Sequence, residues 1–318
     1  MKSLEDLANA LISQRAPEGW TFHSVTFVWN SEEAPENFDR QQEPRRNRKQ
    51  PIVREFTETE IGIPYARNRA LDIARDDGIT HLVFIDDDCL PRANWLEQLL
   101  TVVDETGADV VAGGWRITAR GTVSSWLPGR VFGIKHYYFA GKNIEDRDEL
   151  PTAYTRNVVF ATSLLNQLAP EHQRFPESMV GTGGSDSVFF ARAHTSGARI
   201  IYAPEAKVEE TYDSSRLTLR WHFFRRMRNT QVRLRRRQET RESLAEPKVA
   251  AATVSLLLLS LPASVIVLPV ALFSKSARKL VASTLLHITP LAGALLWWLG
   301  IEYQEYAHRF RFRSRRTQ

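Results

Sequence analysis

The stretch HLVFIDDDC, residues 81–89, joins an apolar strand pattern to three adjacent carboxylates. Like charges side by side repel and each resists desolvation, so such a cluster needs a cation, a positively charged partner or solvent around it. In an open α/β sheet, ligands bind outside the carboxyl ends of the strands. In an extended chain Asp86 and Asp88 share a face, whereas Asp87 points away. The pattern predicts a carboxylate pair that suits Mg²⁺ or Mn²⁺ bridging a diphosphate, with a solvated acidic turn as the alternative.

Strand and helix patterns alternate on both sides of this stretch. The spacing of apolar residues predicts helices over residues 3–14, 63–75 and 94–103, and strands over residues 22–29, 81–85 and 109–117. This succession is typical of an α/β domain with a mostly parallel central sheet flanked by helices. The polar, proline-containing residues 31–50 are expected to form a long surface loop.

Composition bounds the class of protein. With 318 residues, 43% of them hydrophobic and 25% charged, the chain is long and apolar enough for a sizeable core, which excludes a disordered protein. A single cysteine, Cys89, excludes an internal disulfide framework and favours a reducing compartment. Residues 1–10 carry acidic side chains and lack an apolar segment, so they do not read as a cleavable signal peptide.

Two long uncharged stretches lie near the C-terminus. Residues 249–274 (26 residues) and 280–301 (22 residues) are each long enough to cross a hydrocarbon core of roughly 30 Å. Only KSARK separates them, and the second is followed by interfacial-type aromatics, so they predict a helical hairpin in the membrane. Three prolines within them leave two alternatives open, buried core helices and a re-entrant or interfacial hairpin. The aromatics are Trp297, Trp298 and Tyr303.

Basic residues flank these stretches and predict their orientation. Arginines crowd residues 216–241 and 309–316, so both flanks are expected to be cytoplasmic. The upstream flank also places apolar side chains at helical spacing among arginines, which is typical of a helix on an anionic membrane surface, and nucleic acid is not expected as a partner beside two spans. Those apolar side chains are Leu217, Trp221, Phe224 and Met227.

Four regions follow from these patterns. The expected order along the chain is an α/β domain over residues 1–215, a basic amphipathic membrane-surface segment over 216–246, a two-helix membrane hairpin over 247–303 and a basic cytoplasmic tail over 304–318.

A glycine-rich turn, GTGG, precedes Ser185 and Asp186. Glycines let a backbone approach a ligand closely. Asp186 stands at the start of a predicted helix, where a carboxylate is favoured by the helix dipole and acts as an N-cap. A second interpretation is a general base beside a bound sugar, accepting the proton of an attacking hydroxyl.

An ordered set of motifs carries a resemblance. They are GIPYARNRALDIARDDGITHLVFIDDDCLPRANWLEQLL (residues 62–100), TRNVVF (155–160), GTGGSDSVFFARAHTSGARIIYAPEAKVEE (181–210) and RLTLRW (216–221). Together they resemble the family 2 glycosyltransferases of GT-A fold, and are most similar to the branch that builds bacterial exopolysaccharides such as succinoglycan. The resemblance runs from about residue 4 to 240 and implies inverting transfer of a sugar from a nucleotide-diphosphate donor, a UDP-sugar, to an acceptor hydroxyl.

The resemblance also implies roles for individual residues. Asp86 would contact the ribose or the metal, Asp88 would bind Mg²⁺ or Mn²⁺, and Asp186 would be the catalytic base. The donor would lie beside Arg67, Asn68, Asp86, Asp87 and Asn30. A weaker likeness assigns the acceptor or the diphosphate to Gly183, Gly184, Arg220 and Trp221, and Arg216 belongs to the same cationic and aromatic element.

The implied setting is the bacterial inner membrane. The predicted hairpin and basic helix would hold the site at the cytoplasmic leaflet, in contact with membrane lipids. There a polyprenyl-diphosphate-linked saccharide would present the acceptor hydroxyl, and the catalytic domain and both termini would be cytoplasmic.

The chain departs from the family pattern in three places. Ser185 stands where relatives have a Glu, Trp29 stands where they place an Asp against the base, and their first strand has no counterpart before residues 4–14. We therefore expect a sheet that lacks a central strand. A start assigned too far downstream and a truncated copy both explain it, and retention of the three motif aspartates favours the first.

Two other functions are compatible with parts of the pattern. A non-catalytic membrane scaffold of a polysaccharide assembly complex would keep the fold without metal-dependent nucleotide binding. A metal-dependent phosphotransferase would use the aspartate triplet, but no stretch resembles its nucleophile loop.

Overall fold

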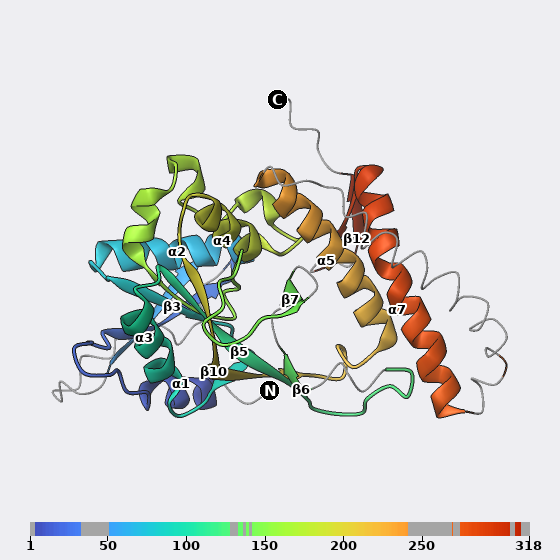
Figure 1. Ribbon diagram of the computed structural model, residues 1–318, viewed down its shortest axis with the longest axis horizontal. Coiled ribbons are helices and arrows are strands. Elements are labelled where there is room, and N and C mark those ends of the chain that lie inside the picture. Colours follow the sequence, from blue (N-terminus) through green and yellow to red (C-terminus); the bar gives the residue numbers. More distant parts are fainter. Residues whose placement is uncertain are drawn as a thin grey trace. The chain divides into compact units, whose positions relative to one another are not determined.

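The computed structural model describes residues 4–32, 51–127, 133–135, 138–139, 142–240, 269, 274–305 and 309–312. The chain forms two compact units, which are treated separately below (Figure 1). The first comprises Met1–Ile117, Ile134–Val180 and Ser185–Thr211. The second comprises Thr118–Gly133, Gly181–Gly184 and Tyr212–Gln318.

Helices and strands alternate along the chain up to Tyr212. The helices are α1 (Leu4–Ile12), α2 (Ile63–Asp76), α3 (Trp95–Thr106) and α4 (Ser185–Thr195), with short 3-10 helices at Thr162–Gln167, Pro170–His172 and Glu177–Met179. The strands are β1 (Ser24–Asn30), β2 (Ile52–Glu58), β3 (His81–Ile85), β4 (Cys89–Pro91), β5 (Val110–Ala119), β6 (Gly133–Lys135), β7 (Tyr138–Phe139), β8 (Lys142–Asn143), β9 (Asn157–Ala161) and β10 (Ile200–Tyr212). The α/β class is confirmed, and β3 has the predicted bounds.

The six-stranded sheet contains antiparallel pairs, whereas the sequence predicted a mostly parallel sheet. The six-stranded sheet has the order β3-β9-β5-β10-β4, with β6 beside β5, and β9 runs antiparallel to both β3 and β5. β10 and β4 also pair antiparallel, and the separate pair β1–β2 is parallel. The prediction is wrong for β3–β9 and β5–β9 because β9, recognised from the sequence only as a motif, inserts between two strands that share a direction. It is also wrong for the pair β10–β4.

Two apolar cores cover the two faces of this sheet. Because side chains alternate along a strand, Val110 and Val158 enter one core while Val111 and Val159 enter the other. The first core contains a cluster of aromatic rings, and the second is filled mainly from α1 and α3. The rings of the first core are Phe84, Phe160, Phe175, Phe189 and Phe190.

A buried asparagine fixes the end of β9. The Asn157 amide donates to the carbonyl oxygens of Gly114 (2.8 Å) and Ala206 (2.7 Å), and its own oxygen accepts from the indole of Trp95 (2.7 Å). A Cβ on Gly113 would lie 2.2 Å from this amide nitrogen, so glycine is required there. The Asn157 side chain thus links β9 to β5 and β10 and satisfies two of their buried carbonyl groups.

The second unit is built around two packed helices. They are α5 (Leu219–Glu239) and α7 (Lys275–Trp298), followed by the antiparallel pair β11 (Ile301–Gln304) and β12 (Arg309–Phe312). A Cβ on Gly293 of α7 would lie 2.5 Å from the carbonyl oxygen of Met227 on α5, so the two helix backbones approach closely. The Gln231 side chain donates to the Ile301 carbonyl (2.9 Å) and accepts from the Tyr303 amide (3.0 Å), which ties α5 to β11.

Several predictions for this region need correction. α7 begins at Lys275, so the presumed connecting residues KSARK are helical, and Arg309–Phe312 is a strand instead of part of a tail. Tyr303 and Trp297 are buried, and Leu217 and Met227 are buried instead of facing lipid, because β11 and α7 supply the apolar partners for α5.

The predicted hairpin is not confirmed. Nearly all of residues 249–274 lie outside the described residues, so the first arm has no structural description. Within the described part of the chain, α7 alone is long and apolar enough to cross a membrane, judged by length and composition.

Candidate functional site

The aspartate triplet forms a turn at the carboxyl end of β3. The Cys89 amide donates to the Asp86 carbonyl (3.1 Å), which closes a four-residue turn, and β4 begins at Cys89. Asp87 is exposed, whereas Asp86 and Asp88 are half-buried. The Asp88 carboxylate is close enough to raise the pKa of Asp86, and the strand alternation assumed from the sequence ends at Ile85.

Asp86 lies at the centre of a charged cluster in the first unit. Burial raises its pKa to about 6, and the carboxylates of Asp88 and Asp186 push it in the same direction. Arg67 and Arg156 oppose the rise. The structure thus brings together three of the predicted acidic residues and one predicted arginine, and it holds them with internal cations that only partly offset the cost of burial.

Arg67 connects the aspartate turn to the start of α4. Its guanidinium donates to the Ser185 hydroxyl (2.8 Å) and lies 3.6 Å from the Asp186 carboxylate, and it stacks over the Phe175 ring. Ser185 is buried, so the residue that replaces the family's Glu positions this arginine.

Asp186 lies in the first turn of α4, with its carboxylate held from two directions. One oxygen accepts from the Ser187 amide (2.7 Å). The other accepts long hydrogen bonds from the Thr155 amide (3.3 Å) and hydroxyl (3.4 Å). A carboxylate oriented in this way, with one weakly bound oxygen, is suited to take a proton from a hydroxyl group.

Arg156 and Glu210 join the cluster and were not singled out from the sequence. Arg156 binds Glu210 (2.7 Å), lies over the Trp115 ring, and accepts a backbone hydrogen bond from Asp86 at its carbonyl (3.4 Å). The alternation of β10 could have indicated Glu210, because Val208, Glu210 and Tyr212 occupy alternate positions and are all buried. An acid on the buried face of a strand calls for a cationic partner.

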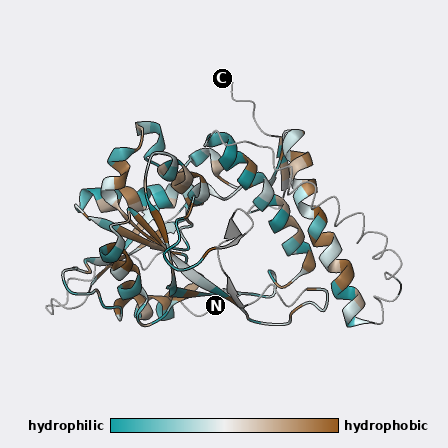
Figure 2. Cartoon of the chain, viewed as in Figure 1, coloured by the Kyte–Doolittle hydropathy of each residue, from teal (hydrophilic) through white to brown (hydrophobic). Residues whose placement is uncertain are grey.

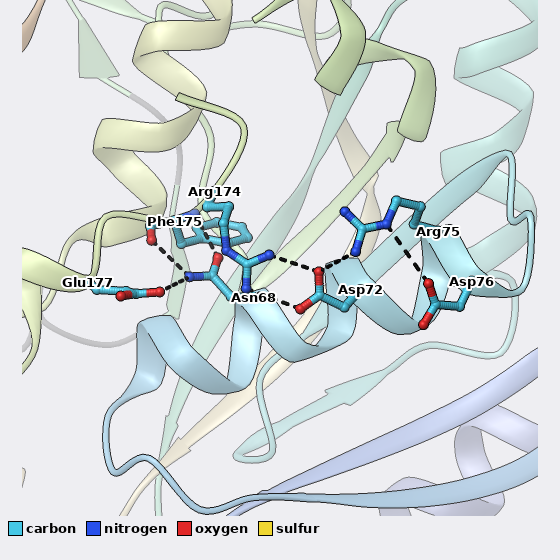
Figure 3. Close-up of polar contacts among 7 residues, drawn as sticks. All are labelled: Asn68, Asp72, Arg75, Asp76, Arg174, Phe175 and Glu177. Atoms are coloured by element: carbon cyan, nitrogen blue, oxygen red, sulfur yellow. Dashed lines mark hydrogen bonds and ion pairs between the residues drawn. The ribbon is translucent and has the colours of Figure 1, made fainter. Parts of the chain in front are cut away.

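Asn68 has a structural role in the chain as it stands. Its side chain donates to the Phe175 carbonyl (3.1 Å) and the Glu177 carboxylate (3.2 Å) and accepts from the Phe175 amide (2.8 Å), as Figure 3 shows. One turn further along α2, the Asp72 carboxylate accepts hydrogen bonds from both terminal guanidinium nitrogens of Arg174. These bonds fix the segment that carries Phe175 beneath Arg67, and donor binding by Asn68 stays a prediction.

The remaining predicted residues have no contact with the cluster that the structure describes. Asn30 ends β1, where its amide donates to the carbonyls of Glu58 and Glu60 and accepts from the Gly62 amide, so it ties down the loop before α2. The weakly assigned residues belong to the second unit and are not placed against the first. They are Gly183, Gly184, Arg220 and Trp221.

The fit to a divalent metal is partial. Within the described ranges, no group of three or more His, Cys, Asp and Glu side chains is arranged to hold a metal ion. Mg²⁺ is commonly held by one or two carboxylates together with substrate phosphates. Asp86 and Asp88 therefore suit a metal that arrives with a diphosphate, and they do not form a permanent metal centre.

Comparison with known proteins gives a consistent assignment. Residues 30–168 match the family model described as Glycosyl transferase family 2. The chain is 34% identical over 173 residues to the succinoglycan biosynthesis protein ExoM of Rhizobium meliloti (strain 1021), a match that covers 54% of this chain and 51% of that protein, so it spans about half of this relative's length.

Solved structures give weaker likenesses. The structure of S. aureus TarS 1-349 is 15% identical with a TM-score of 0.45, covering 100% of this chain and 94% of that one. A longer S. aureus TarS structure is 19% identical with a TM-score of 0.44, covering 74% of this chain and 40% of that one.

Proposed function

We propose that this chain, whose residues 30–168 match the model of glycosyl transferase family 2, transfers a sugar from a nucleotide-diphosphate donor to a saccharide acceptor in bacterial exopolysaccharide synthesis. The observation that carries the proposal is the gathering of Asp86, Asp88 and Asp186 around Arg67 in the first unit. An acid whose pKa is raised, here Asp86, beside other carboxylates is typical of a site that binds a charged ligand.

Asp86 and Asp88 hold the donor end of this site. Asp88, with Asp86 beside it, would hold Mg²⁺ or Mn²⁺ together with the donor diphosphate, and the ion would stabilise negative charge on the leaving group. Arg67 and Arg156 are the cations already acting on Asp86, and they are the chain's own groups for offsetting the charge of a bound diphosphate. UDP is the nucleotide that the family resemblance favours.

Asp186 acts on the acceptor. Its weakly held carboxylate oxygen accepts the proton of the attacking hydroxyl, while Thr155, Ser187 and Arg67 keep the carboxylate in place. Attack on the anomeric carbon from the side opposite the diphosphate inverts its configuration in one displacement. Donor and acceptor roles thus belong to different carboxylates.

The acceptor is a polyprenyl-diphosphate-linked saccharide, and the protein works at the cytoplasmic face of the bacterial inner membrane. Support comes from the likeness to a succinoglycan biosynthesis protein and from the apolar, membrane-length helix α7. The mode of membrane attachment is considered below.

A transfer assay tests the proposal. Full-length protein in detergent or vesicles is incubated with radiolabelled UDP-sugars, Mn²⁺ and a lipid extract from an exopolysaccharide-producing bacterium. We expect label to move into the lipid-linked fraction, chelation with EDTA to stop it, and Asp88→Ala to reduce it at least a hundredfold.

The matched control is Asp76→Asn, an exposed aspartate on α2 outside the cluster. It is expected to retain wild-type transfer. If folded wild-type protein neither transfers sugar nor binds any UDP-sugar with Mn²⁺, the enzymatic proposal fails and the non-catalytic scaffold is the better reading.

A further inference from the structure

The helix α7 leaves part of one apolar side uncovered. With 3.6 residues per turn, its strongly exposed apolar side chains fall on one side, where Ala277, Val281 and Thr284 near its start are nevertheless buried. Its other buried residues fall on the opposite side. The exposed set is Leu280, Leu285, Leu295, Trp298 and Leu299. The buried set on the opposite side is Ala282, Leu286, Thr289, Gly293 and Trp297.

The covered side of α7 packs against a highly charged helix. α5 contains eight arginines, and Figure 2 shows it as mainly hydrophilic. Its backbone approaches Gly293 at Met227. Arg225 and Arg228 bind Glu305 at 2.7 Å, just beyond α7, so charged groups are built into the packing of this helix pair.

The N-terminal end of α7 also makes a polar contact within the second unit. The Arg278 guanidinium donates to the Ser125 hydroxyl (2.8 Å), and Ala277 and Val281 pack against Trp126. Polar contacts within the second unit therefore anchor α7 near both of its ends.

This packing conflicts with an upright transmembrane helix. A helix of 24 residues is about 36 Å long, so it would fill a hydrocarbon core of roughly 30 Å from side to side. An upright α7 would carry the arginines of α5 into the hydrocarbon with it, where charged side chains are strongly unfavourable. A helix that lies along the surface keeps α5 among water and headgroups.

We propose that α7 lies along the surface of an anionic lipid leaflet, with Leu285, Leu295 and Trp298 in the boundary between headgroups and acyl chains, and does not cross the bilayer. Charge complementarity supports this partner. Exposed Arg311 follows the end of α7 at which Leu295 and Trp298 are exposed, and exposed Lys275 and Lys279 lie in the first turns of the helix.

The aromatic residues at that second end fit the same arrangement. Trp298 is 67% exposed, and Phe310 and Phe312 on either side of Arg311 are exposed as well. Trp is enriched at the membrane–water interface, where an amphipathic ring contacts both phases. The inference rests on the membrane association proposed above, and it is independent of sugar transfer.

Cysteine labelling decides between the two arrangements. The native thiol, Cys89, is 2% exposed and provides a low background. Full-length Ser276→Cys and Arg311→Cys variants are treated with a membrane-impermeant maleimide in spheroplasts and in inverted membrane vesicles. Both original side chains are exposed, so the substitutions are expected to leave the fold intact.

We expect both introduced thiols to react in inverted vesicles and neither to react from outside in spheroplasts. Labelling of the Ser276→Cys thiol from outside, with the Arg311→Cys thiol labelled only from the cytoplasmic side, means that α7 crosses the bilayer and overturns the proposal. Recovery of the protein in the soluble fraction also overturns it. Nucleotide binding measured on the same membranes reports separately on the proposed function.

A depth measurement provides a second test. Spin labels at Leu285→Cys and Leu295→Cys lie about 15 Å apart along the helix axis. For a helix along the surface, their depths in anionic vesicles are expected to agree within about 5 Å, at roughly 5–10 Å below the headgroups. A difference of about 15 Å contradicts the proposal. Val123→Cys, exposed and apolar but off α7, is the matched control and is expected to lie in water.

Discussion

The two units treat a buried carboxylate in opposite ways. In the first unit, burial raises the pKa of Asp86 to about 6, and two neighbouring acids add to the rise. In the second, burial alone would raise the pKa of Glu305, but Arg225 and Arg228 outweigh it and hold the pKa below its usual value. One acid is left partly uncompensated, whereas the other is fully paired.

This difference distinguishes the proposed binding site from a structural contact. Glu305 joins α5 to the chain that follows α7, and its partners bond it at 2.7–2.8 Å. Arg67 and Arg156 lie near Asp86, yet its pKa is still raised above the ordinary value. A cationic ligand would reduce the repulsion between Asp86 and the neighbouring carboxylates. An acid whose charge is uncompensated in the free protein is therefore the better candidate for function.

The largest effect is expected for Asp186, the proposed catalytic base. Asp186→Asn keeps the shape of the side chain and removes its ability to take a proton, so turnover should fall by about 10²–10⁴-fold. Sugar transfer at saturating donor measures this, with thermal unfolding as the check on folding. Activity within a factor of ten of wild type would remove Asp186 from the role of base.

In the second unit, the corresponding change should affect stability. Glu305→Ala leaves Arg225 and Arg228 without their shared partner, and breaking such a buried pair is expected to cost about 3 kcal/mol of unfolding free energy. Denaturant unfolding measures it.

An exposed ion pair supplies the control for that loss. Glu105→Gln removes the partner of Arg147 at the surface of the first unit, where pairs contribute less than about 1 kcal/mol. Equal losses for the two variants would show that Glu305 is not the structural contact described here.

The two units should also respond to pH in opposite directions. Between its ordinary value of 3.8 and about 6, Asp86 binds more protons in the native state than in the unfolded state, so stability falls as pH rises through this window. The full difference is about 3 kcal/mol at 1.36 kcal/mol per pKa unit. Glu305 stabilises above its ordinary value of 4.5, and this contribution is lost as pH falls below it.

Unfolding in a chelating buffer from pH 4 to pH 7 tests this sign. Asp86→Asn should flatten the dependence between pH 4 and 6. A wild-type protein whose first unit gains stability across that range would contradict the assignment of Asp86 as the uncompensated acid.

Within the charged cluster, the smallest effect is expected at Ser185. Ser185→Ala removes the acceptor of one hydrogen bond from Arg67 and should cost about 1–2 kcal/mol of stability. Because Arg67 stays beside Asp186, transfer should fall less than for Asp186→Asn. A loss of transfer as large as that of Asp186→Asn would mean that the hydroxyl itself contacts substrate.

Local patterns predicted the elements that position the site. The apolar run before Asp86 specified β3, and the alternating periodicities specified α2, α3 and β5 within a few residues. Local patterns did not predict the strand order, because the insertion of β9 between β3 and β5 depends on pairing between distant segments. The antiparallel pairs β3–β9 and β5–β9 followed from that insertion and were therefore missed.

The site shows the same division. Acids in a recognisable motif, Asp86 and Asp186, were identified from sequence, and the structure brings their charges together. Arg156 and Glu210 were missed because their pairing joins residues 54 positions apart. Asn30 and Asn68 stand in motif positions, but their side-chain amides donate to backbone carbonyls. A sequence motif does not distinguish an asparagine that binds a ligand from one that stabilises a loop.

Donor binding by two variants tests the central claim most directly. UDP with Mn²⁺ is titrated calorimetrically into wild type, Asp88→Ala and Asp186→Asn. The division of labour among the carboxylates predicts that Asp88→Ala loses donor affinity by at least tenfold, while Asp186→Asn binds within about twofold of wild type and yet fails to transfer. Wild-type affinity in Asp88→Ala, or equal loss of affinity in both variants, would contradict it.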